Sequence, residues 1–440
     1  MQNRGPLPKT KYATRPQPRL ACGQDEIRAR VLDCRDAREA VPIKLVATLA
    51  IIFAGLAGRS AVDKVLTLRG GAELVAFWAQ LGSVVELVAG VALAGVGTGI
   101  SVLVAQAGAP DRQRELLGES LKLGLAVSAP VMFAVAAAAF AFPGDLVGGL
   151  SRSLIALAAA AGCIAVMPGM LNGYWLGQQR RDLMLALALV SAAVQLAAAL
   201  VASRPNVLWA LVLAQALPAV AVAFVFRPAR REPSRDEIHD RRSLRRYILP
   251  GIVIGVLTPL ATVAARDIVS MGMSWREVGL LQALWRVSDW VAAVAAGVMA
   301  VHFLPRLAAA HRTPRFAARL RRAALVTILP SALALAALVA LQHRVFTLLY
   351  DESFRISDTA VTLFFAGTLA RIASWLPLYA LYAMRRTKSI AIGEFLSMPL
   401  FAVLLAAYPR PLTLEAAGGL WLASYLGYGL FNLWAVRRAY

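Results

Sequence analysis

Charged residues are scarce in this sequence. Asp, Glu, Lys and Arg make up 16% of its 440 residues, whereas ordinary soluble domains contain about a quarter. Hydrophobic residues reach 59%, and the mean hydropathy is +0.63. This composition excludes an ordinary soluble protein and is typical of a polytopic membrane protein.

Residue types that build catalytic and metal centres are also few. The three cysteines and four histidines lie far apart, at Cys22, Cys34, Cys163, His239, His302, His311 and His343. Their spacing predicts no disulfide framework, metal site or catalytic triad. A membrane polymerase or glycosyltransferase would also need a long external loop, and the longest one expected here, His343–Asp358, has about sixteen residues. We therefore expect a transporter without catalytic residues, bound metal or cofactor.

Long apolar segments account for most of the chain, and each is long enough to cross a bilayer as a helix. There are twelve, at residues 41–66, 73–105, 117–141, 146–177, 183–202, 207–226, 247–270, 276–304, 323–341, 358–384, 388–408 and 414–436. The predicted fold class is an all-α polytopic membrane protein with about 12 transmembrane helices in two six-helix bundles.

Acidic residues are outnumbered by basic ones, 25 to 46, which gives a net charge of +21. Such an excess can indicate nucleic-acid binding, but here the basic residues follow the predicted topology. If the N-terminus is cytoplasmic, the inside segments carry 34 Lys and Arg and the outside segments nine. The positive-inside rule then predicts both termini in the cytoplasm and no nucleic-acid partner.

Four regions are expected along the chain. Residues 1–40 are polar and basic and predict a disordered cytoplasmic arm, with the alternative that Gln24 to Ala40 form a helix on anionic lipids. Residues 41–226 and 247–440 hold six spans each, joined by a basic cytoplasmic linker at 227–246. Spans two and eight both lead into a Pro-containing turn and a basic amphipathic stretch. Two such repeats are typical of transporters whose halves rock about a central site; a chance likeness of basic loops is the alternative.

The eighth span carries charges where a membrane helix rarely does. Arg286 and Asp289 lie about a third of the way along Ser274–Leu307, at a cost of roughly 2.5–3.5 kcal/mol each. Being three residues apart, they can pair with each other as a clamp. Alternatively, this helix lines a polar cavity for a charged substrate, or it is the core helix of a soluble protein.

Four motifs resemble one family of transporters. They are AGVGTGISVLVAQ at Ala94–Gln106, SWREVGLLQALWRVSDW at Ser274–Trp290, FLPRL at Phe303–Leu307 and AIGEF at Ala391–Phe395. Over about residues 41–438, the chain resembles the Wzx-type flippases for O-antigen and enterobacterial common antigen. These belong to the polysaccharide-transporter branch of the multidrug/oligosaccharidyl-lipid/polysaccharide exporter superfamily. The resemblance implies a V-shaped, MATE-like pair of bundles around a cationic cavity in the bacterial inner membrane.

The resemblance also implies a function. Undecaprenyl-pyrophosphate-linked oligosaccharide repeat units would pass from the cytoplasmic to the periplasmic leaflet by alternating access, with anionic lipids, a polysaccharide polymerase and a chain-length regulator as partners. Matching positions are held by Lys64, Trp275, Glu277, Gly279, Gln282, Asp289, Arg371 and Glu394. The charges of Arg59, Asp63, Glu86 and Arg286 depart from the family pattern. They leave the glycan and the coupling ion open.

The chemistry of such a lipid points to particular side chains. Its pyrophosphate carries about two negative charges and cannot cross hydrocarbon unsolvated, and arginine binds phosphate oxygens with a bidentate fork. The expected substrate-site residues are Arg59, Lys64, Arg286, Asp289 and Arg371. Aromatic faces for the sugar are expected from Trp285, Trp290 and Trp375, although each tryptophan taken alone is better explained as an interface anchor or a packing residue.

Two carboxylates inside spans, Glu394 and Glu86, are the expected coupling groups for a proton or sodium gradient. Burial favours the neutral form of a carboxyl and so allows proton exchange. Glu394 comes first because it matches the family, with Arg371 as its expected partner when the cavity is empty. The alternative for Glu394 is a permanent hydrogen bond to a neighbouring helix.

Other functions and motifs stay open. A peptidoglycan lipid-precursor flippase would also suit a cationic cavity, whereas a cation-coupled drug exporter of the same superfamily would need acidic residues without arginines. The run Gly95–Gly99 resembles a phosphate-binding loop, but it lacks the preceding strand and the lysine. Close helix packing is the expected role of these glycines.

Overall fold

The computed structural model describes residues 24–107, 109–141, 149–220, 222, 255–310, 313–384 and 386–439. Contacts divide the chain into two units, Met1–Val46 and Ala47–Tyr440. Within the described residues all regular structure is helical. In chain order the elements are α1 (Gln24–Ala92), η1 (Leu93–Gly97), α2 (Thr98–Gln106), α3 (Pro110–Ala141), α4 (Arg152–Gly177), α5 (Arg181–Val201), η2 (Arg204–Asn206), α6 (Val207–Ala216), the helical residues 255–272, α9 (Trp275–Val298), η3 (Met299–Phe303), α10 (Leu304–Ala310), α11 (Arg315–Ala340), α12 (Gln342–Leu349), α13 (Asp358–Ala383), α14 (Thr387–Phe395), α15 (Met398–Ala407) and α16 (Leu414–Ala439).

The first unit contains the start of α1. The helix that the sequence allowed from Gln24 to Ala40 is present, because α1 begins at Gln24 and continues through the predicted end of the arm. Residues 1–23 and the predicted linker 227–246 lie outside the described residues.

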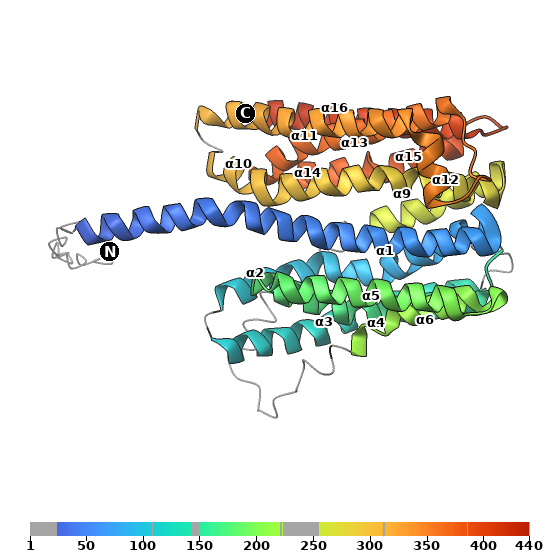
Figure 1. Cartoon of the computed structure of the whole chain (residues 1–440), viewed down its shortest axis with the longest axis horizontal. Coiled ribbons are helices and arrows are strands. Elements are labelled where there is room, and N and C mark those ends of the chain that lie inside the picture. Colours follow the sequence, from blue (N-terminus) through green and yellow to red (C-terminus); the bar gives the residue numbers. More distant parts are fainter. Residues whose placement is uncertain are drawn as a thin grey trace, which may run out of the picture. The chain divides into compact units, whose positions relative to one another are not determined.

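In the second unit, α1 consists of two helices joined at Gly71. The backbone of Gly71 has φ 69° and ψ −163°, which a glycine adopts without a Cβ clash. The chain turns back at this point (Figure 1), so the first predicted span and most of the second lie in one continuous element. Each of the twelve predicted spans overlaps described helix, and parts of the spans 146–177, 207–226 and 247–270 lie outside the described residues.

Seven described helices are long and apolar enough to cross a membrane by length and composition. One of them, Thr48–Gln106, contains the second predicted span and most of the first. The helix α9, which carries Arg286 and Asp289, and the polar-ended α16 are not among the seven. The fold-class prediction of a multi-span, all-helical protein is confirmed.

The two halves share a local irregularity. The second span passes through the π-helical turn η1 into α2, and the eighth passes through the π-helical turn η3 into α10. In both halves a short connection then leads into a long helix, α3 or α11. Because isolated π turns are rare, their recurrence at equivalent places supports the predicted internal repeat.

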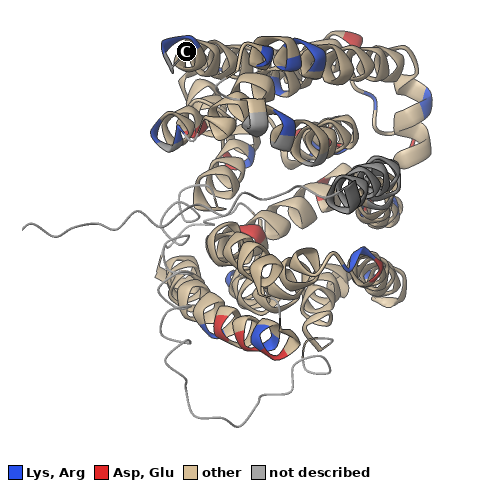
Figure 2. Cartoon of the chain, turned by 90° about the vertical axis from the view of Figure 1, so that its left-hand side faces the viewer, with Lys and Arg blue, Asp and Glu red and all other residues tan. Residues whose placement is uncertain are grey.

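Connections of the second unit gather at its two ends. The α2–α3 turn, the α10–α11 turn and the end of α16 lie at the left in Figure 1, and the bend within α1 and the helix α12 lie at the right. Figure 2 looks onto the left end and shows Lys and Arg on helix ends there, including that of α16. Within the second unit, the α2–α3 turn, the α10–α11 turn and the end of α16, all predicted as inside segments, therefore share one end.

Glycines bring helices of the two halves into backbone contact. A Cβ at Gly90 of α1 would lie 2.6 Å from the carbonyl oxygen of Gly255. One at Gly279 of α9 would clash with the carbonyl oxygen of Ala72 in α1. Small residues at such crossings let membrane helices approach closely, so α1 packs tightly against both helices that begin the second half.

A candidate substrate cavity

A polar cavity of about 520 Å³ lies within the second unit. Its wall is formed by α1, α4, α5 and α6 from the first half, and by residues 255–272, α9, α13, α15 and α16 from the second. In transporters that are built from two repeats, the substrate site lies at the interface between the repeats.

Six charged residues line this cavity. Four are arginines and two are carboxylates, which leaves an excess of two positive charges: Arg59, Glu86, Arg266, Arg286, Asp289 and Arg371. The sequence predicted five of them as substrate-site or coupling residues. Arg266 was not assigned a role.

Arg286 forms an ion pair with Asp63 rather than with Asp289. Its Nε donates to Asp63 Oδ2 at 2.8 Å, and the two side chains are 12% and 1% exposed. The clamp expected within α9 is therefore wrong. Helical spacing allowed that pair, but a buried carboxylate of α1 supplies a partner on another helix, so the pair ties α1 to α9.

Arg371 pairs with Asp289. Its Nη1 donates to Asp289 Oδ1 at 2.8 Å, which joins α13 to α9. The guanidinium also lies over Trp375, Trp421 and Tyr425, 5.3 to 5.9 Å from the ring centroids. The expected pairing of Arg371 with Glu394 is thus not found in this conformation.

Arg266 of the helix 255–272 is 5% exposed. Its Nη1 donates to Ala79 O at 3.2 Å, Gln80 Oε1 at 3.3 Å and Ser83 Oγ at 2.7 Å, all on α1. Its Nη2 donates to Gln282 Oε1 of α9 at 2.7 Å, and its guanidinium lies 5.4 Å from the Trp285 ring centroid. This single side chain connects three helices across the repeat boundary.

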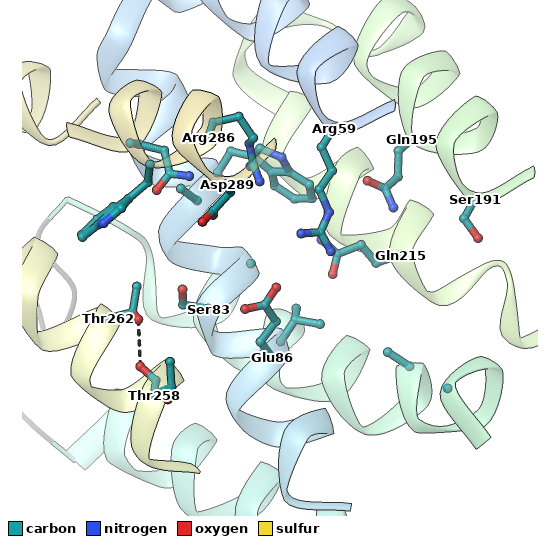
Figure 3. Close-up of a pocket in the computed structure, with 18 of the residues that line it drawn as sticks. Arg59, Ser83, Glu86, Ser191, Gln195, Gln215, Thr258, Thr262, Arg286 and Asp289 are labelled. Carbon is teal, nitrogen blue, oxygen red and sulfur yellow. Dashed lines mark hydrogen bonds between the residues drawn. The ribbon is translucent and has the colours of Figure 1, made fainter. Parts of the chain in front are cut away.

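Neutral polar groups complete the wall. Figure 3 shows Arg59 extending from α1 toward Gln215, with Glu86 on another stretch of the same element. Amides and hydroxyls come from α1, α5, α6 and the helix 255–272: Ser83, Ser191, Gln195, Gln215, Thr258 and Thr262. Such uncharged donors and acceptors suit the hydroxyl groups of a sugar. The sequence could have indicated these residues as cavity-lining, because they are polar residues within otherwise apolar spans.

The predicted tryptophans differ in position. Trp285 lines the cavity and packs against Phe364, Phe401 and Trp421, with ring centroids 5.7 to 6.1 Å away. Trp290 is not among the lining residues, and neither is Trp375, which contacts Arg371. The tryptophans that line the cavity are therefore Trp285, Trp78 of α1 and Trp421 of α16.

Two further predicted residues lie outside the cavity wall. Lys64 donates to the backbone carbonyl oxygens of Thr347, at 3.2 Å, and Tyr350, near α12. Glu394 accepts a hydrogen bond of 3.0 Å from the Tyr428 hydroxyl of α16. Both therefore contact neighbouring helices in this conformation.

The described residues show no group of three or more His, Cys, Asp or Glu that could hold a metal ion. Residues of the run Gly95–Gly99 are helical, in η1 and α2, and Gly97 O lies 2.8 Å from a Cβ built at Gly173 of α4. The run is therefore helical rather than a phosphate-binding loop, and it is Gly173 of α4 that allows the close approach to its backbone.

No protein-family profile and no curated protein matches the sequence. Solved structures match along nearly the whole chain. An inward-facing multidrug resistance MATE family transporter of the MOP superfamily superposes with a TM-score of 0.66 at 14% identity, covering 91% of this chain and 96% of that one. The chain therefore has the MATE transporter fold.

Two other structures with this fold extend the comparison. An outward-facing conformation of a multidrug resistance MATE family transporter matches with a TM-score of 0.62 at 14% identity, covering 90% of this chain and 95% of that one. A MOP superfamily transporter from Pyrococcus furiosus, described as having a binding pocket of reverse polarity, matches with a TM-score of 0.61 at 15% identity, covering 90% and 94%. At these identities the likeness concerns the fold.

Proposed function

We propose that this protein is a flippase that moves a lipid-linked oligosaccharide with a pyrophosphate headgroup from the cytoplasmic to the periplasmic leaflet by alternating access. The MATE transporter fold supports transport across a membrane, and the sequence motifs around α9 support the polysaccharide branch of the superfamily. The observation that carries the proposal is the cavity, which combines four arginines with neutral hydrogen-bonding groups.

The charge of the cavity favours an anion over a cation. Two of its arginines are neutralised by Asp63 and Asp289, and the remaining Arg59 and Arg266 face one carboxylate, Glu86. Binding a cationic drug would leave these arginines close to a like charge, which costs free energy. For the transporter from Pyrococcus furiosus, too, the polarity of the pocket was taken to suggest a different function.

A peptidoglycan lipid precursor is the second candidate, because it carries the same pyrophosphate and also a glycan. The neutral cavity groups from α5 and α6, Ser191, Gln195 and Gln215, suit sugar hydroxyls of either substrate. The two lipids differ in the peptide that the precursor bears, so they can be compared directly.

Native mass spectrometry of the detergent-purified protein tests the substrate class. We expect bound undecaprenyl-pyrophosphate oligosaccharide, and weaker binding of the corresponding monophosphate and of a cationic dye. Stronger binding of the dye than of the pyrophosphate lipid would contradict the proposal. Preference for the peptide-bearing precursor would select the second candidate.

A further inference from the structure

The arginines that line the cavity are not equivalent as anion ligands. Arg286 and Arg371 each donate to a carboxylate at 2.8 Å. An oxyanion that bound to either would have to compete with a negative charge already in place. These two arginines are therefore engaged in joining helices.

Arg266 has a different set of partners. Its four described hydrogen-bond acceptors are a backbone carbonyl, two amides and a hydroxyl, from Ala79, Gln80, Gln282 and Ser83. The carboxylate of its neighbour Asp267 instead accepts from Gln80 Nε2 at 3.1 Å. No described carboxylate accepts a hydrogen bond from Arg266. The charges of Glu86, Asp267 and Asp289 act on its guanidinium without direct contact, so the hydrogen-bonding position itself holds neutral groups.

Part of its hydrogen-bonding capacity is also unused. Nε of Arg266 is buried and has no partner among the described residues, and Nη2 has one acceptor, Gln282, for its two N–H groups. Nε and Nη2 form one of the edges on which a guanidinium holds two oxygens of a phosphate. Gln282 lines the cavity as well, so an oxyanion in the cavity can replace its amide oxygen.

We infer that Arg266, together with Arg59, forms the phosphate-binding position of the cavity, and that Gln282 occupies it in the empty protein. Arg59 is exposed, lines the same cavity and has no hydrogen-bond or ion-pair partner among the described residues. The ligand class is a phosphate or pyrophosphate ester. This assignment rests on the proposed function and reassigns its headgroup ligands away from Arg286 and Arg371.

Gln282→Glu tests the assignment without removing a buried charge. The new carboxylate has the shape of the amide and takes the same hydrogen bond from Arg266 Nη2, so it neutralises the guanidinium and fills the position. Gln282→Met is the matched control, because it removes the acceptor and adds no charge. Binding of radiolabelled inorganic pyrophosphate is measured in maltoside detergent, which contains no phosphate.

We expect Gln282→Glu to lower the pyrophosphate affinity by about tenfold or more, as for loss of a charge-assisted hydrogen-bond site, without a lower unfolding temperature. Gln282→Met removes the acceptor that competes for Arg266 and should bind pyrophosphate at least as tightly as the unsubstituted protein, and Arg59→Gln should bind it more weakly. Equal binding by Gln282→Glu and the unsubstituted protein overturns the assignment. So does a larger loss in Arg371→Gln than in Gln282→Glu.

A second arm separates a lipid headgroup from free phosphate. A polyprenyl pyrophosphate should displace the labelled pyrophosphate from the same protein, and a polyprenol without phosphate should not. If unlabelled inorganic pyrophosphate displaces the label and the polyprenyl pyrophosphate does not, the ligand is not a lipid headgroup. Flipping of the intact lipid is measured independently. If the protein flips the lipid but Gln282→Glu binds pyrophosphate normally, the proposed function stands and only the assignment of Arg266 fails.

Discussion

Arg286 of α9 and Asp63 of α1 are joined by an ion pair of 2.8 Å across 223 residues of sequence. Asp63 is 1% exposed, and its second carboxylate oxygen, Oδ1, has no hydrogen-bond partner among the described residues. Removing one member of a buried pair leaves an uncompensated charge, whereas removing both does not. This relationship makes the structural role of Arg286 testable.

We predict that Asp63→Leu alone destabilises the protein by roughly 3–5 kcal/mol and that adding Arg286→Met recovers most of the loss. Thermal unfolding in detergent, compared across the two single variants and the double variant, provides the measurement. A double variant as unstable as Asp63→Leu would contradict the interhelical ion pair.

The crossing of α1 with the helix 255–272 depends on a glycine. Gly90→Ala would place a Cβ 2.6 Å from the carbonyl oxygen of Gly255, so we expect a loss of about 1–3 kcal/mol from overpacking. Gly82→Ala is the matched control on the same helix, because no atom lies within 4 Å of a Cβ built there. Similar unfolding temperatures for the two variants would show that the helices do not meet at Gly90.

Much of the architecture was predictable from the sequence. Each predicted span overlaps described helix, because runs of about twenty apolar residues have few alternatives in a bilayer. The prediction that α9 faces a polar cavity could also be made, since charges inside a span need a wet or paired environment. Its helical spacing nevertheless suggested the wrong partner for Arg286.

The pairing of charges could not be read from sequence spacing. Asp63 and Arg371 lie on α1 and α13, more than eighty residues from their partners on α9, and helix packing decides which side chains meet. The sequence shows Arg266 as a third arginine inside a predicted span. It does not show which groups Arg266 contacts, and the structure places neutral acceptors of α1 and α9 around its guanidinium.

Energy coupling is expected at Glu86 rather than Glu394. Glu86 lines the cavity and is exposed there, so a carboxylate at this position meets whatever enters the cavity, as a coupling residue inside a membrane span must. Glu394 is instead hydrogen-bonded by Tyr428.

We therefore predict that Glu86→Gln makes transport insensitive to an imposed pH gradient, while Glu394→Gln leaves the gradient response intact. Transport into proteoliposomes with imposed proton or sodium gradients is the measurement. The opposite pattern would assign coupling to Glu394, and a response to sodium alone in both variants would exclude proton coupling at either residue.

The charge bias predicts which end of the second unit faces the cytoplasm. In a variant without Cys22, Cys34 and Cys163, single cysteines at Asn206 or Thr413 should react with an impermeant thiol reagent in cells with a permeabilised outer membrane. A cysteine at Ala109, in the α2–α3 turn, should react after the inner membrane is opened. Labelling of Ala109→Cys in intact spheroplasts would reverse the predicted orientation.

Flipping by the purified protein tests the central claim most directly. A polyprenyl-pyrophosphate oligosaccharide with a fluorophore on its sugar is incorporated into proteoliposomes, and an impermeant reductant is added outside. We predict that the reductant quenches lipid of both leaflets when the protein is present, and of the outer leaflet alone in protein-free vesicles. Equal quenching with and without the protein, in sealed vesicles and at every imposed gradient, would contradict transport of this lipid.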